Sequence, residues 1–174
     1  METKNTSTGK IALIYGVILG LISIAFSVML YVMDLAYQRN WAASAVSIVM
    51  ICALIFIGIY QFRSANEGYL SLPEALKVGI GVALIGSIFS IVYLWVLTTY
   101  IEPGFWDKTF ELARIEMQEN YVNLSSDKID EIITTQKNYL WLTYPTILIF
   151  NIFIGFVMAL IIGLILKKSR DTEL

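Results

Sequence analysis

Four long apolar runs without a charged side chain divide the chain. They cover residues 11–33, 41–62, 78–101 and 140–166, and polar segments separate them. A helix needs about 20 apolar residues to cross a hydrocarbon core about 30 Å thick, and each run is longer than that. The first run also exceeds the apolar region of a signal peptide, about 7–15 residues, and no A-x-A site follows it, so we expect a retained span.

The pattern therefore predicts an all-α fold, an integral membrane four-helix bundle over residues 11–166. Short polar tails at residues 1–10 and 167–174 flank it. In the fourth run, Pro145 either kinks the helix or marks its start, because proline removes a backbone hydrogen bond and restricts the residue before it.

Residues 102–139 form the one long polar segment between two runs. Pro103 and Gly104 end the third run. Apolar side chains then recur twice at helical spacing, with the turn-forming sequence "NLSSD" between the two stretches. The first stretch contains Trp106, Phe110, Ala113, Met117 and Tyr121, and the second contains Ile129, Ile133 and Leu140. We expect an amphipathic helical hairpin that lies on the outer membrane surface or caps the bundle.

The shorter linker over residues 63–77 contains "SLPE", which is typical of a helix start. Ser71 and Glu74 match a capping box, and Pro73 falls in the first turn, where its missing N–H costs nothing. We interpret the linker as a capped elbow rather than as a gate or ligand site, with one unbroken helix from about Leu72 to Ile101.

The charges between the runs predict the orientation in the membrane. The tails and the elbow carry seven Lys and Arg and five Asp and Glu. The segments at the other ends of the spans carry five Lys and Arg and nine Asp and Glu. Because Lys and Arg near span ends favour the cytoplasm, both termini should be cytoplasmic and residues 102–139 should lie outside.

Composition supports a membrane protein and excludes several kinds of chemistry. Apolar residues make up 57% and charged residues 15%, against about 45–50% and 25% in soluble domains. The chain has no histidine, and its single cysteine, Cys52, lies in an apolar run. The net charge is −2 without a basic patch, so no nucleic-acid partner is expected. Glu111, Glu116 and Glu119 point in different directions around a helix, so we expect a solvated acidic face and no metal or other cofactor.

Small residues at helical spacing predict how the spans pack, because close backbone approach holds helices together in lipid. These helix-packing residues are Gly16, Gly20, Gly79, Ala83, Asn151, Gly155, Ala159 and Gly163. We expect the Asn151 amide to bond to another helix, with ligand binding as the alternative. A stripe of small residues that is not used within the bundle would allow a homo-oligomer to form.

Several short stretches resemble a known family of bacterial membrane proteins, grouped as domain of unknown function 4199. They are the lysine before "IALIYGVILG", the linker "EGYLSLPEALKVG", "YIEPGF" after the third run and the closing "IGLILKK". The resemblance covers nearly the whole chain and implies a four-span protein of the bacterial inner membrane. It implies no catalytic residues.

No catalytic constellation is visible, since catalysis needs reactive groups that converge. The expected function is therefore a non-enzymatic bundle in the lipid bilayer that scaffolds, regulates or senses through other membrane proteins. The alternative is a small oligomeric channel or permease, with Asn151 and nearby serines along its pathway.

Overall fold

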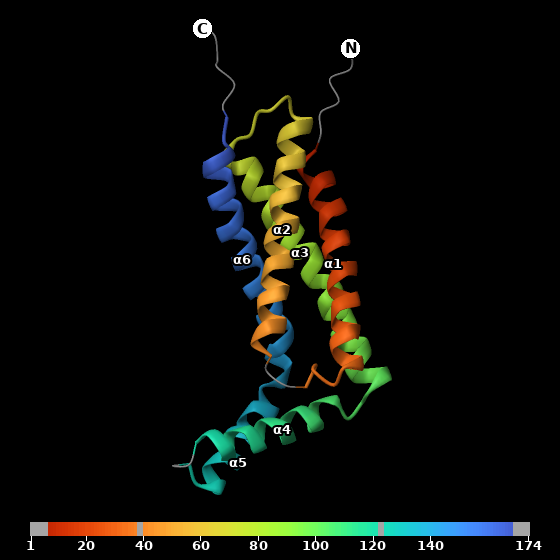
Figure 1. Cartoon of the computed structure of the whole chain (residues 1–174), viewed down its shortest axis with the longest axis vertical. Coiled ribbons are helices and arrows are strands. Elements are labelled where there is room, and N and C mark those ends of the chain that lie inside the picture. Colours follow the sequence, from red (N-terminus) through yellow and green to blue (C-terminus); the bar gives the residue numbers. More distant parts are fainter. Residues whose placement is uncertain (1–6, 38–39, 122–123, 169–174) are drawn as a thin grey trace.

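The computed structural model describes residues 7–37, 40–121 and 124–168. In this part of the chain there are six α-helices and no strand. Four long helices run side by side, and two shorter helices form a hairpin across one end of them (Figure 1). The long helices are α1 (Thr8–Val32), α2 (Trp41–Ala65), α3 (Leu72–Val96) and α6 (Thr143–Leu166), and the hairpin consists of α4 (Phe105–Asn120) and α5 (Ser126–Asn138). We call the end of the bundle that carries α4 and α5 the hairpin end, and the other the elbow end.

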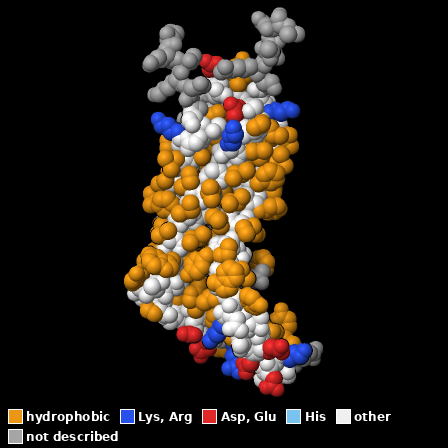
Figure 2. Space-filling model, turned by 180° about the vertical axis from the view of Figure 1, so that it is seen from behind, with side chains coloured by type: hydrophobic (Ala, Val, Ile, Leu, Met, Phe, Trp, Pro, Cys, Tyr) orange, Lys and Arg blue, Asp and Glu red, His pale blue; other side chains and the backbone are white. Residues whose placement is uncertain are grey.

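The four long helices have the length and composition of membrane spans. With their short extensions the spans cover Thr8–Val32, Trp41–Ala65, Leu72–Ile101 and Leu140–Leu166. On the face shown in Figure 2, hydrophobic side chains cover the length of the bundle and charged side chains gather at its two ends. The predicted all-α membrane bundle with a helical hairpin between the third and fourth spans is confirmed.

Helix α3 lies at the centre of the bundle. It packs against α1, α2 and α6, and α2 also contacts α1 and α6. Within the described residues α1 and α6 do not contact each other, so α3 and α2 separate them. The core between these helices includes Ile55 and Ile59 of α2 and Val78 and Val82 of α3, all 0% exposed.

The third span departs from the predicted unbroken α-helix at its last turn. Residues Leu97–Ile101 form a π-helix, in which the Glu102 N–H donates to the Leu97 carbonyl at 2.8 Å. A π turn holds one residue more than an α turn, and each residue corresponds to about 100° of rotation. The chain after Ile101 therefore leaves the span in a direction that an α turn would not give.

The elbow between α2 and α3 is held at both of its sides. The Glu74 carboxylate accepts hydrogen bonds from the Ser71 N–H at 2.8 Å and from the Ser71 hydroxyl at 2.7 Å, which closes the start of α3. Leu70, which is fully buried, exchanges two backbone hydrogen bonds with Lys168 at 3.0 and 3.1 Å. The end of α6 is thereby tied to the elbow.

Pro145 marks the start of the fourth span. A short 3-10 turn at Leu140–Leu142 precedes α6, which begins at Thr143, so Pro145 falls in the first helical turn. In the first turn a backbone N–H has no carbonyl partner within the helix, so the N–H that proline lacks costs no hydrogen bond there.

The hairpin has a small hydrophobic core of its own. Phe110 of α4 packs against Ile129 and Ile133 of α5, and Trp106, Ala113, Met117, Leu124 and Leu140 surround them. Tyr121, expected in the same stripe, is instead 59% exposed because α4 ends just before it, at Asn120.

Candidate functional site

The first group of expected packing residues forms a seam between α1 and α3. A methyl group added at Gly16 would lie 2.6 Å from Ile85 Cβ, and one added at Gly20 would lie 2.5 Å from Phe89 Cγ. On the α3 side, a methyl group added at Gly86 would lie 2.7 Å from Leu19 Cδ2. Each helix thus supplies glycines against larger side chains of the other.

The second group forms a seam between α3 and α6. A methyl group at Gly155 would lie 2.5 Å from Ala83 Cβ, and one at Gly79 would overlap Ala159 in the same way. A methyl group added at Gly163 would lie 2.8 Å from Ala75 Cβ. The two helices are therefore close enough here that only hydrogen or a methyl group fits between their backbones.

Asn151 lies one turn from this seam and faces a small cavity. No hydrogen bond joins its amide to another described residue, so the expected bond to another helix is absent from the described part of the chain. The cavity measures about 20 Å³ and takes side chains from all four spans, with Ser23, Ser87 and Ser90 as the other polar ones. The Ser87 hydroxyl donates to the Ala83 carbonyl at 2.6 Å, and the Ser90 hydroxyl donates to the Gly86 carbonyl at 3.2 Å.

A polar network at the hairpin end joins three segments that are distant in the sequence. Tyr37, 6% exposed, follows α1, and its hydroxyl donates to the Glu102 carboxylate at the end of the third span. Lys108 of α4 places its ammonium 3.7 Å from the centre of the Tyr37 ring and 3.3 Å from Asp34 Oδ1. Phe105 packs against the same ring at 5.1 Å between centroids.

Burial, and after it the hydrogen bond and negative charge of Glu102, raise the pKa of the Tyr37 hydroxyl above its usual value. Tyr37 therefore remains a proton donor to Glu102 under physiological conditions. Sequence analysis missed this network because its members lie at positions 34, 37, 102, 105 and 108, and no periodicity links them. The one sequence signal is the presence of an acid and two aromatic residues in and near the short "MDLAY" loop.

Two grooves follow the flanks of α4, and they differ in how their charges are paired. The groove between α4 and α5 measures about 470 Å³ and contains two ion pairs, Arg114–Asp130 at 2.8 Å and Lys137–Asp107 at 3.5 Å. Glu111 also lines it. In the described residues no three His, Cys, Asp or Glu side chains converge as metal ligands.

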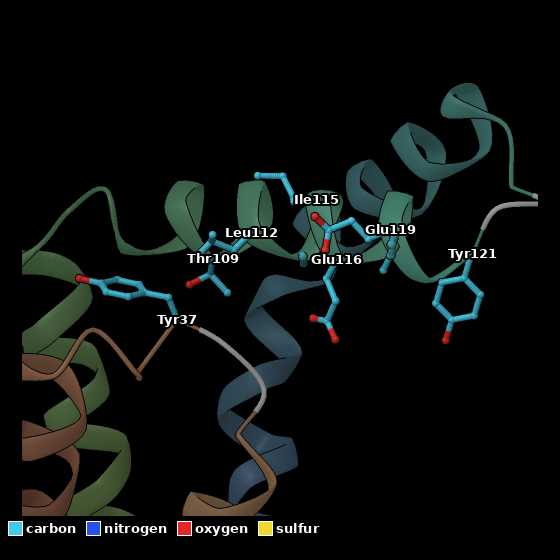
Figure 3. A pocket seen from close by; sticks show the side chains of 9 residues that line it. Tyr37, Thr109, Leu112, Ile115, Glu116, Glu119 and Tyr121 are labelled. Carbon is cyan, nitrogen blue, oxygen red and sulfur yellow. The ribbon is translucent and has the colours of Figure 1, made fainter.

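The groove on the other flank of α4 measures about 530 Å³ (Figure 3). Its polar side chains are Glu116, Glu119, Thr109 and two tyrosines, Tyr37 at one end and Tyr121 at the other. Neither glutamate has an ion-pair partner among the described residues. We call this the α4 groove.

Comparison with known proteins gives one family. No curated protein and no solved structure matches the chain. A family model, described as protein of unknown function (DUF4199), matches residues 14–168 and confirms the resemblance seen in the sequence. The chain therefore belongs to the DUF4199 family.

Proposed function

We propose that the protein is a non-enzymatic bundle of a bacterial inner membrane that scaffolds, regulates or senses through partner proteins. The supporting observation is the network around Tyr37, which joins the loop after α1, the end of the third span and the start of α4. Because Tyr37 is buried, the hairpin is attached to the spans by more than the chain connections. A partner bound to the hairpin would therefore act on α1 and α3 together.

The placement of the charged groups supports a role without catalysis. The four apolar runs contain no Asp, Glu, Lys, Arg or His, and three carboxylates at the hairpin end are paired with Lys or Arg. A catalytic site needs a nucleophile, an acid or a base held within reach of one reacting atom. The groups described here are instead distributed along the surface of the hairpin.

We further propose that both ends of the chain are cytoplasmic. Thr8 and Leu166 lie at the elbow end, and the segments there carry the larger number of Lys and Arg. The positive-inside rule then directs the elbow end to the cytoplasm and the hairpin outward.

The proposal is tested by photocrosslinking in native membranes. A photoreactive amino acid at Lys128 or Glu131, both exposed on α5, should give adducts with one or a few other proteins. The matched control is the same amino acid at Leu164, which is 53% exposed on the apolar surface of α6 and should give mainly lipid adducts. Adducts with further copies of this chain alone would contradict a scaffold.

The second candidate is a small oligomeric channel or permease, and the cavity beside Asn151 favours it. Side chains of all four spans line this cavity, but about 20 Å³ is the space of a single water molecule. Passage of a solute would therefore need either an opening of the bundle or a path between subunits. Loss of a flux in Asn151→Leu, with the fold intact, would support this candidate over the scaffold.

A further inference from the structure

The cavity beside Asn151 lies within the apolar part of the bundle. Asn151 is about 12 Å from the start of α6, a helix about 36 Å long. The hydrocarbon core of a bilayer is about 30 Å thick, so a residue at this position of a membrane span lies inside it. Hydrocarbon offers no hydrogen-bonding partner, so a polar group at this depth is satisfied only within the bundle.

Two polar side chains that line the cavity make no hydrogen bond to another described residue. They are the Asn151 amide of α6 and the Ser23 hydroxyl of α1. Helices α1 and α6 do not contact each other within the described part of the chain, because α2 and α3 lie between them. A link between these two side chains therefore needs a bridging molecule.

Helix α3 supplies the complementary hydrogen-bonding groups. Because the Ser87 and Ser90 hydroxyls donate their protons to carbonyls of their own helix, at 2.6 and 3.2 Å, their oxygens have only lone pairs to offer the cavity. The Asn151 amide nitrogen and the Ser23 hydroxyl have protons to donate. The cavity thus combines two donors from α1 and α6 with two acceptors from α3.

Size and charge identify the molecule that fits. A water molecule needs a cavity of about 10–15 Å³ or more and two to four polar partners, and this cavity measures about 20 Å³. A larger solute does not fit. The described residues that line the cavity include no charged side chain, so nothing there compensates the cost of burying an ion.

We propose that the cavity binds one water molecule, which joins α1, α3 and α6. The water accepts hydrogen bonds from the Asn151 amide and the Ser23 hydroxyl. It donates hydrogen bonds to the Ser87 and Ser90 hydroxyls. The two outer spans are thereby linked in mid-membrane without direct contact. The inference rests on the four-span bundle alone and does not depend on the proposed partner-mediated function.

Nuclear magnetic resonance of the full-length protein in deuterated detergent tests the proposal. With ¹⁵N-labelled asparagine, the side-chain amide signals of Asn151 are assigned by their loss in Asn151→Leu. In the wild-type protein these amide protons should show cross-peaks to water that have opposite signs in NOESY and ROESY spectra. Opposite signs identify a bound water, whereas exchange of the amide protons with bulk water gives equal signs. The absence of such cross-peaks from the wild-type protein would overturn the proposal without any variant.

A matched pair of variants tests whether the water occupies this cavity. Ser23→Val puts an apolar side chain at the cavity wall and should remove the water cross-peaks while the Asn151 signals remain. Ser27→Val makes the same change one turn further along α1, at a residue that does not line the cavity, and should keep them. Circular dichroism should show that both variants fold. Cross-peaks that persist in Ser23→Val, or that disappear equally in both variants, would contradict a water shared by α1 and α6.

Discussion

Gly155 and Asn151 lie one turn apart on α6, and their surroundings differ in how much change they can accept. Gly155 faces the Ala83 side chain with no free space, whereas Asn151 faces a cavity. In lipid the hydrophobic effect does not hold helices together, so close packing of their surfaces contributes most to helix–helix association. The glycine should therefore matter more to stability than the Asn151 amide.

Gly155→Leu should destabilise the bundle strongly. The added side chain would have to displace Ala83, and overpacking of this kind costs about 1–3 kcal/mol or more. Thermal unfolding in detergent measures the effect as a lower midpoint. The control is Ile161→Leu, at a side chain that is 47% exposed on the same helix and should unfold like the wild-type protein. A wild-type midpoint for Gly155→Leu would contradict the close approach of α3 and α6.

Asn151→Leu should change the free energy of unfolding by no more than about 0.6 kcal/mol, the average value of an interhelical polar contact in membranes. The amide makes no hydrogen bond among the described residues, and leucine has a similar size. The same unfolding measurement checks this prediction. A loss much larger than that of Ile161→Leu would mean that Asn151 is bonded to another helix after all.

At the scale of elements, the hairpin depends on the network around Tyr37. Tyr37→Phe removes the hydroxyl that donates to the half-buried Glu102 carboxylate, and a hydrogen bond to a charged group contributes about 1.5–3 kcal/mol. The loss should be local to α4 and the loop after α1. Amide hydrogen exchange should show faster exchange there than in the wild-type protein, with α3 and α6 unchanged.

The same network predicts a dependence on alkaline pH. Because the pKa of Tyr37 is raised in the folded protein above the usual value of about 10, its contribution to stability is complete below pH 10. Above pH 10 the unfolded state loses the tyrosine proton first, so this contribution falls as the pH rises. Unfolding midpoints between pH 8 and 11 should fall more steeply in the wild-type protein than in Tyr37→Phe; parallel slopes would contradict the assignment.

Sequence predicted the elements better than the contacts between them. Apolar, uncharged runs longer than 20 residues can be covered along their length only by lipid, so the spans could be predicted. The pairing of Ser71 with Glu74 is local in the sequence, so the elbow could be predicted as well. The π turn at Leu97–Ile101 and the Tyr37–Glu102 bond arise from tertiary packing, and no local pattern encodes them. Helical spacing identified small residues such as Gly16 and Gly79, but it could not show that they lie in two different seams of α3.

At the scale of the whole molecule, the two ends of the membrane bundle carry different features. The elbow end holds the start of α1 and the end of α6 and is closed by the bonds between Leu70 and Lys168. The hairpin end carries the paired charges, the Tyr37 network and the α4 groove. This division requires an even number of membrane crossings between Thr8 and Leu166, with α4 and α5 on the side opposite to these two residues.

Cysteine accessibility in intact cells shows on which side of the membrane each end of the bundle lies. Cys52 is the single native cysteine, and replacing it by alanine leaves a background for Ser7→Cys at the elbow end and Ser126→Cys on the hairpin. A membrane-impermeant maleimide should label position 126 in intact cells and position 7 only after permeabilisation. Labelling of both positions from the same side would contradict the four-span bundle.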